Sequence, residues 1–208
     1  MTTSYCTVES LAAEVGISDG DDDAQLTLAI TSASRQIDDH CGRRFYQDDA
    51  VVVRSFYAES ARCVDLLDQP DDGPSTEIST TTGLIVKIDE DGDGTFGTTL
   101  TISTDFILLP LNAAADGHAF SQIYLADNYS FPRPSNGRPG VQVTAKFGWP
   151  SIPDNLEKAC VIQAAQLYHA KKAMFGAVQL GDSAAMRARP MDPVAAGLLG
   201  RLRKPAIG

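Results

Sequence analysis

Residues 141–160 read VQVTAKFGWPSIPDNLEKAC, and the pattern changes within this stretch from that of a strand to that of a helix. Residues 141–147 are rich in β-branched and aromatic side chains, which is typical of a strand. Pro150 helps to end that strand, and Pro153 suits the first turn of a helix. The apolar side chains that follow, from Leu156 to Met174, supply a wide helical face. The sequence therefore predicts a β region that meets a helix near residue 150.

The hundred residues before this junction carry the same strand texture. Their short β-branched or aromatic segments are residues 51–53, 54–57, 63–67, 84–88, 98–103, 106–109 and 122–125. Turn-forming clusters separate them at residues 69–74, 89–94 and 132–140. This spacing predicts antiparallel strands in a sandwich or barrel-like region.

The residues before the β region predict two helices. Thr7 is a suitable N-cap for the first helix, and Gly16 can end it. The second helix begins at the acidic residues 21–23, where the helix dipole favours negative charge, and ends at Gly42. Its apolar stripe, at helical spacing, is Leu26, Ile30, Ala33, Ile37 and Cys41.

The predicted fold class is α+β, with a helical core of three main helices and an inserted antiparallel β domain. The helical core comprises residues 1–49 and 150–176, and the β domain comprises residues 50–149. Residues 177–208 are rich in Gly, Ala and Pro, which predicts an extended C-terminal arm that becomes ordered on a partner.

Charge is distributed unevenly along the 208 residues. The net charge is −10, but residues 186–208 carry +4 and the remaining 185 residues carry −14. An acidic body repels nucleic acid, so we do not expect specific DNA binding. No run approaches the ~18 apolar residues that a membrane span needs, and the N-terminus lacks the pattern of a signal peptide. We therefore expect a soluble protein, made and retained in the cytoplasm.

Residues for catalysis do not stand out in the sequence. The four cysteines are scattered without a C-x-x-C pair, which indicates small buried side chains, and the three histidines are isolated. Neither a G-x-S-x-G motif nor a P-loop is present. The glycines 92, 94 and 97 match a dinucleotide fingerprint, but a strand follows them where that motif requires a helix. We expect no enzymatic activity and no cofactor.

Asp89, Asp91 and Asp93 form the one candidate metal site. Together with Gly92-Asp93-Gly94 they match the first half of a calcium-binding EF-hand loop, but position 12 is Leu100 instead of Glu. The flanking segments predict strands and not helices. We favour an acidic hairpin turn, with a weak calcium site as the alternative.

Trp149 is the only tryptophan in the chain and lies at the junction. We expect it to be a core anchor, and an exposed binding side chain is the alternative.

Six segments, in this order, resemble the head-to-tail connector (adaptor) proteins of tailed bacteriophages, the gp6-like family. They are residues 5–11 (YCTVESL), 33–38 (ASRQID), 42–45 (GRRF), 105–112 (DFILLPLN), 143–149 (VTAKFGW) and 152–159 (IPDNLEKA).

The resemblance implies a structural protein of the virion neck, at the head-tail interface, made in the host cytoplasm. It implies a homo-oligomeric ring beneath the portal protein, a dodecamer that extends the DNA channel. DNA would pass without specific binding, and a downstream head-closure or tail protein would dock below. The C-terminal arm of such proteins reaches into the portal. The residues of this arm expected to bind the portal are Arg187, Arg189, Leu198, Leu199, Arg201, Leu202, Arg203 and Lys204.

Two other functions stay open from the sequence. One is another neck or tail-completion subunit, which would bind tail protein instead of the portal. The other is a calcium-dependent β-sandwich module, such as a decoration protein of the virion.

Overall fold

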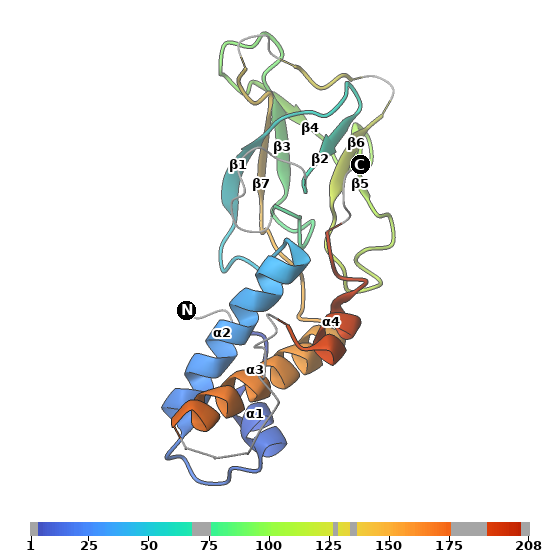
Figure 1. The fold of residues 1–208 in the computed structure, drawn as a ribbon. Helices are drawn as coiled ribbons and strands as arrows, with labels where there is room; N and C mark the ends of the chain where they lie inside the picture. The colour runs from blue at the N-terminus through green and yellow to red at the C-terminus, as the bar shows by residue number, and fades with distance from the viewer. Residues whose placement is uncertain (1–3, 68–75, 127–128, 134–136, 176–190, 205–208) are drawn as a thin grey trace. The chain divides into compact units, whose positions relative to one another are not determined.

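The computed structural model describes residues 4–67, 76–126, 129–133, 137–175 and 191–204, with side chains up to residue 170 and again from residue 191. The chain groups into two compact units (Figure 1). Unit 1 comprises Met1–Arg43 and Ile152–Gly208, and unit 2 comprises Arg44–Ser151. Among the described residues, none of the helices is both long and apolar enough to cross a membrane.

Unit 1 is helical. Its elements are α1 (Val8–Val15), α2 (Asp23–Cys41), α3 (Asp154–Phe175) and α4 (Pro193–Leu199). The Thr7 side chain caps α1 by accepting a hydrogen bond from the backbone N–H of Ser10, and Gly16 and Gly42 end α1 and α2 with positive φ. These caps are those that the sequence predicts.

The core of unit 1 forms where α2 packs against α3. The predicted stripe of α2, from Leu26 to Cys41, is at most 2 % exposed at each of its five positions. Leu156, Ala159 and Cys160 of α3 are fully buried. Burial of these two apolar faces supplies the hydrophobic stabilisation of the unit.

Residues 191–204 of the predicted extended arm are folded, and residues 177–190 and 205–208 lie outside the described residues. Helix α4 packs on α3, and Ala195, Leu199 and Leu202 are buried. The Asp192 side chain starts the helix by accepting hydrogen bonds from two backbone N–H groups, and Pro193 follows at its first position. An N-cap and an apolar face that finds a partner within the same chain explain why residues 191–204 are folded.

Unit 2 contains two antiparallel sheets. The four-stranded sheet has the order β1 (Val52–Phe56), β7 (Val141–Ala145), β3 (Ile85–Ile88), β4 (Thr98–Leu100). The three-stranded sheet has the order β2 (Cys63–Asp65), β6 (Gln122–Leu125), β5 (Phe106–Leu109). The predicted α+β class with antiparallel sheets is confirmed.

The two sheets share one core, and side chains alternate along their strands between this core and the outside. Phe56, Val86 and Val143 of the first sheet and Val64 and Ile123 of the second belong to one cluster of buried residues. Sheets that bury their inner faces together form a sandwich, so their outer faces point in opposite directions.

Candidate functional site

Basic side chains gather where the chain leaves α4 and returns to the end of α2. The backbone N–H of Lys204 donates to the carbonyl of Cys41 over 2.8 Å, and Nη2 of Arg43 donates to the carbonyl of Arg203 over 3.2 Å. Arg201 and Arg203 are exposed. We call Arg43, Arg201, Arg203 and Lys204 the basic cluster.

The position of the basic cluster follows from local geometry. Helix α2 ends at Cys41, and Gly42 turns the chain with a φ of 65°. The carbonyl groups at a helix C-terminus carry partial negative charge, which favours cations there. A methyl group added at Gly42 would lie 3.6 Å from Cβ of Lys204, so the two backbones approach closely. The cluster is therefore a group of cations at a helix end, with Arg201 and Arg203 exposed and Arg43 and Lys204 half-buried, and it is suited to an acidic partner.

The expected portal-binding residues fall into three groups: members of the basic cluster, leucines within unit 1, and residues outside the described ranges. Arg201, Arg203 and Lys204 belong to the basic cluster. Leu199 is fully buried and Leu202 is 8 % exposed, so both serve the internal packing of unit 1, while Leu198 is half-buried. Arg187 and Arg189 lie outside the described residues.

Cys41 is buried beneath the basic cluster. Burial raises the pKa of its thiol to about 11, while the positive charges of Arg43 and Arg203 act in the opposite direction. This thiol is therefore protonated at neutral pH. A protonated, buried thiol is a poor nucleophile, which fits the expectation of a structural cysteine.

A second buried thiol group joins the N-terminal segment to α3. Sγ of Cys6 donates to Sγ of Cys160 over 3.2 Å, and Oγ of Ser34 lies 3.6 Å from Cys160. The hydrogen bond to Cys160, together with burial, raises the pKa of Cys6 far above its ordinary range. Tyr5 joins the same N-terminal segment to α2, because its backbone N–H donates to Ser34 and its hydroxyl donates to Asp38. The expectation that the cysteines are buried is confirmed for Cys6, Cys41 and Cys160, while Cys63 is half-buried.

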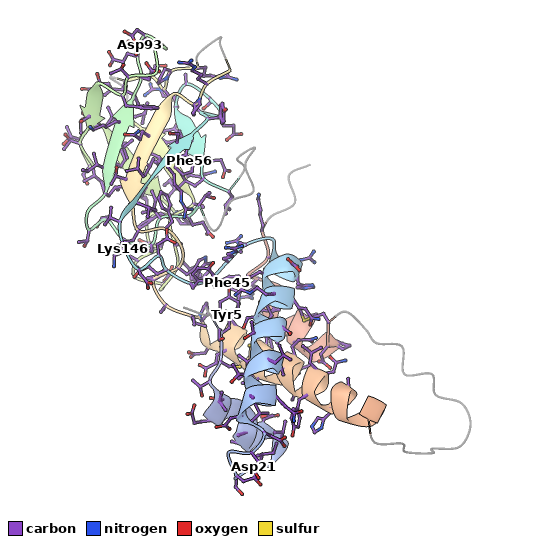
Figure 2. The ribbon with its side chains drawn as sticks, turned by 90° about the vertical axis from the view of Figure 1, so that its left-hand side faces the viewer. Tyr5, Asp21, Phe45, Phe56, Asp93 and Lys146 are labelled. Atoms are coloured by element: carbon purple, nitrogen blue, oxygen red, sulfur yellow. The ribbon has the colours of Figure 1, made fainter. Side chains whose placement is uncertain are left out.

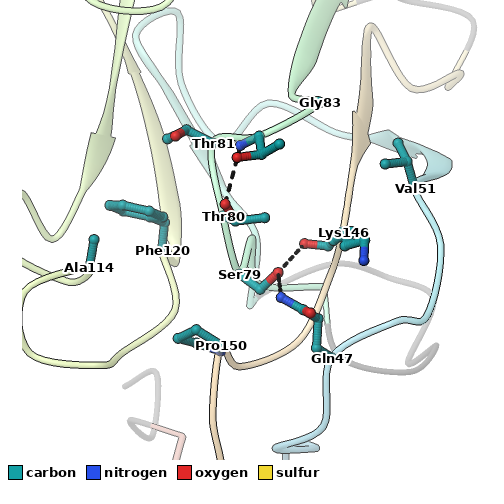
Figure 3. A pocket seen from close by; sticks show the side chains of 11 residues that line it. Gln47, Val51, Ser79, Thr80, Thr81, Gly83, Ala114, Phe120, Lys146 and Pro150 are labelled. Atoms are coloured by element: carbon teal, nitrogen blue, oxygen red, sulfur yellow. Dashed lines mark hydrogen bonds between the residues drawn. The ribbon is translucent and has the colours of Figure 1, made fainter.

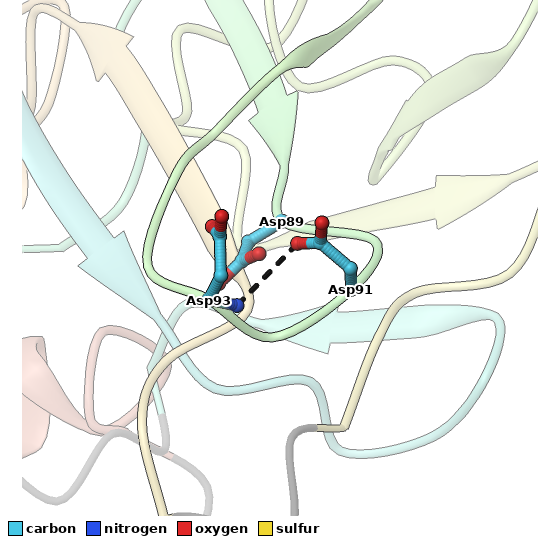
Figure 4. A group of neighbouring side chains, drawn as sticks. All are labelled: Asp89, Asp91 and Asp93. Carbon is cyan, nitrogen blue, oxygen red and sulfur yellow. Dashed lines mark hydrogen bonds between the residues drawn. The ribbon is translucent and has the colours of Figure 1, made fainter.

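The acidic turn lies between β3 and β4, which pair as an antiparallel hairpin. One carboxylate oxygen from each of Asp89, Asp91 and Asp93 lies within 4.8 Å of the others (Figure 4). Asp89 is fully buried, and its two oxygens accept from the backbone N–H groups of Gly92 and Gly94 at 3.0 and 2.9 Å. The flanking strands agree with the interpretation as an acidic hairpin turn.

Trp149 is buried within unit 2, with 4 % of its surface exposed. Its ring lies 5.1 Å from those of Phe45 and His118, measured between centroids. Its Nε1 donates to Oε2 of buried Glu77 over 3.1 Å. Trp149 is therefore a core side chain, and the alternative of an exposed binding tryptophan is wrong.

A cavity of about 560 Å³ opens in unit 2, and the sequence carried no signal for it. Nε2 of Gln47 donates to Oγ of Ser79, and that hydroxyl donates to the carbonyl of Lys146, both over 2.8 Å (Figure 3). Lys146 and Asp93 lie toward opposite ends of this unit (Figure 2). Among the described residues that line the cavity, Lys146 is the only titratable one. The lining residues that the structure describes therefore do not include an acid–base pair.

Comparisons with known proteins give structural relatives only. Neither a protein-family model nor a curated protein matches the sequence. A chain from the neck of an empty gene transfer agent (GTA) particle, computed with C6 symmetry, matches with a TM-score of 0.53 and 19 % identity. This match covers 98 % of the present chain and 91 % of that chain.

Two further structures agree with this match. A chain from the neck of the native GTA particle, computed with C12 symmetry, has a TM-score of 0.50 and 20 % identity, over 100 % of this chain and 97 % of that one. A chain from the virion of the native GTA particle has a TM-score of 0.52 and 21 % identity, over 98 % and 91 %. At such identities the likeness shows that the chain shares the fold of these neck and virion chains.

Proposed function

We propose that the chain is a structural subunit of the neck of a phage-like particle, and that it acts as the head-to-tail connector ring beneath the portal. The observation that carries this proposal is the match to GTA neck chains over nearly the whole of both chains. Because the match includes both compact units, it supports a shared architecture and not only a common motif.

The symmetry of the matched assemblies supports a ring. The two neck structures were computed with C6 and C12 symmetry. A closed ring requires a head-to-tail interface that repeats around one axis. This symmetry and the resemblance of the sequence segments to connector proteins support a dodecamer beneath the portal as part of the proposal.

The negative charge of the body is consistent with a channel through which DNA passes without being bound. The body outside residues 186–208 carries −14, and an acidic wall repels phosphate. The basic cluster is the exception, and we assign it to the portal-facing contact. Arg201 and Arg203 are exposed there, so they can meet acidic side chains of a partner.

The experiment that tests the proposal is co-sedimentation and electron microscopy with the portal ring from the same genome. A coaxial ring on the portal is the expected result. Replacing Arg201, Arg203 and Lys204 by Glu should weaken binding at least about tenfold, since three attractive contacts become repulsive. The matched control replaces Arg133, Arg138 and Lys158, which are exposed elsewhere, and should bind like the wild type.

Two results would count against parts of the proposal. Unchanged binding by the first variant would remove the basic cluster from the portal contact. Binding to tail protein but not to the portal would favour another neck or tail-completion subunit.

A further inference from the structure

The outer face of the four-stranded sheet carries an exposed row of side chains across three strands. Val53 of β1 and Ile85 of β3 both pair with Thr144 of the central strand β7. Val53 is 57 % exposed and Ile85 is 43 % exposed. We call Val53, Thr144 and Ile85 row A.

The three-stranded sheet repeats this arrangement on its own outer face. Cys63 of β2 and Ile107 of β5 both pair with Tyr124 of the central strand β6. Tyr124 is 43 % exposed and Ile107 is 39 % exposed. We call Cys63, Tyr124 and Ile107 row B.

A glutamine-centred row lies beside each of these rows, two residues along the strands. Beside row A, Gln142 pairs with Ser55 and with Lys87. Beside row B, Gln122 pairs with Asp65 and with Leu109. Each outer face thus has a row that contains exposed apolar side chains and a glutamine-centred row. Lys87 lies on one face, and the Asp65 carboxylate, which accepts hydrogen bonds from the Leu67 N–H and from Nε2 of Gln122, lies on the other.

We propose that row A of one copy of this chain packs on row B of the next copy, with Lys87 facing Asp65. This inference rests on the proposed ring and names the surfaces that close it. Exposed apolar side chains at matched positions on a sheet favour burial against a partner, and opposite charges fix which face meets which.

The placement of the two rows selects a second copy as the partner. Because the sheets bury their inner faces together, rows A and B point in opposite directions from one unit. A two-fold dimer would use one face twice and leave the other exposed. Two different, complementary faces on opposite sides give a head-to-tail contact, which forms a ring when the rotation between neighbouring copies closes. The C6 and C12 symmetries of the matched neck assemblies agree with such a contact.

The two rows would form the centre of the interface and not all of it. A stable interface buries about 800 Å² on each partner, and its energy concentrates in a few central, desolvated side chains. Substitution of these side chains should therefore act strongly. Val53, Ile85, Ile107 and Tyr124 are exposed in the single chain, so their substitution should leave its fold intact.

The first test uses two blocked variants of the full chain, measured by sedimentation velocity and electron microscopy, alone and on portal rings. Val53→Glu/Ile85→Glu blocks row A, and Ile107→Glu/Tyr124→Glu blocks row B. Neither variant should form rings, and self-association should weaken at least about tenfold. In an equimolar mixture, the intact row A of one variant can pack on the intact row B of the other, and no further contact is possible. The mixture should therefore give dimers and nothing larger. Leu111→Glu, at a residue 69 % exposed outside both rows, is the matched control and should form rings.

The second test exchanges the charges. Lys87→Glu alone and Asp65→Lys alone should each weaken ring formation, because like charges then face each other. The double variant restores the pair with its signs reversed and should form rings. A mixture of the two single variants should also form rings with alternating subunits, because each contact then joins opposite charges.

The outcomes separate this inference from the proposed function. Rings formed by either blocked variant, or dimers formed by one blocked variant alone, would overturn the head-to-tail contact between rows A and B. Both results would leave the neck function standing if the wild type stacks on the portal. A wild type that forms no ring, alone or on the portal, would overturn the ring and this interface together. Thermal unfolding near the wild-type temperature shows that each variant is folded.

Discussion

Nε1 of Trp149 donates a hydrogen bond to Oε2 of Glu77, 3.1 Å away, and both side chains are buried in unit 2. The carbonyl of Glu77 also accepts from the backbone N–H of Gly148 over 2.8 Å. One residue thus holds both the backbone and the side chain of the stretch that follows β7. A buried carboxylate depends on such donors, because its desolvation is costly.

Trp149→Phe should therefore destabilise the protein by about 1–3 kcal/mol, since it removes a donor to a buried carboxylate and leaves most of the apolar contact. The measurement is urea unfolding followed by circular dichroism, because the variant lacks the only tryptophan of the chain. Tyr57→Phe is the control, since its hydroxyl bond to the Gly137 carbonyl is exposed. Equal stability of the two variants would contradict a structural role for the Trp149–Glu77 bond.

Gly148 itself should not tolerate a side chain. Its φ is +106°, and a Cβ at this position would lie 1.9 Å from the carbonyl oxygen of Tyr46. Gly148→Ala should cost at least about 3 kcal/mol, because backbone strain adds to a clash that only a backbone shift can relieve. Gly97→Ala is the matched control: nothing lies within 4 Å of its added Cβ, so stability should change by less than about 0.5 kcal/mol. Similar unfolding midpoints for the two variants would argue against this account.

Local signals in the sequence predicted most of the fold. The helical stripe of α2, its Gly42 cap and the β3–β4 hairpin each depend on neighbouring residues, so spacing and turn chemistry were sufficient. Rows A and B depend on the pairing register of strands far apart in sequence. Val53 and Ile85 become neighbours only through Thr144, and no local pattern specifies that relationship.

The candidate site was also predicted only in part, because local sequence signals do not show which distant residues pack together. The basic residues near the C-terminus were identified from charge alone, and the backbones of two of them, Arg203 and Lys204, are hydrogen-bonded to residues at the end of α2. Leu199 and Leu202 were expected on a partner, but they are buried in unit 1. An apolar cluster in the sequence shows that a partner surface exists, and it does not show whether that surface belongs to the same chain.

Leu199→Ala should therefore lower the stability of the chain by about 2–5 kcal/mol, the usual cost of truncating a fully buried leucine. Val194→Ala is the control, because Val194 lies in the same helix α4 as Leu199 but is 63 % exposed. Its effect should stay below about 0.5 kcal/mol. The measurement is urea unfolding of the isolated chain. If Leu199→Ala weakens only portal binding and leaves stability unchanged, the leucine acts on the partner and not within unit 1.

The Cys41 thiol should make the stability of the folded chain depend on pH in the alkaline range. Its thiol has an ordinary pKa of 9.0, and burial raises the pKa to about 11 in the folded chain. Below pH 9 the thiol is protonated in both states, so its contribution to stability is complete. Between pH 9 and 11 the unfolded thiol ionises first, and stability falls by up to about 1.4 kcal/mol per pH unit. The stability difference between the wild type and Cys41→Ala should therefore shrink from pH 8.5 to 10.5 in urea unfolding with a reductant. If the stabilities of the wild type and Cys41→Ala change with pH in parallel, burial does not raise the pKa of the Cys41 thiol.

The acidic turn should be stable without calcium. Both oxygens of Asp89 already accept backbone hydrogen bonds, and Asp93 accepts from the N–H of Thr95 over 2.6 Å. A calcium site with a Kd near 10⁻³ M would raise stability by about 1.4 kcal/mol at ~10 mM calcium. We expect no such rise in the Tm of the wild type, measured against magnesium as the control. Asp89→Asn should cost about 1–3 kcal/mol in either ion, because it weakens charge-assisted bonds to Gly92 and Gly94. A calcium-specific rise in Tm that is lost in Asp91→Asn/Asp93→Asn would instead favour the calcium-binding module, because loss of the hydrogen bonds within the turn would lower the Tm equally in calcium and in magnesium.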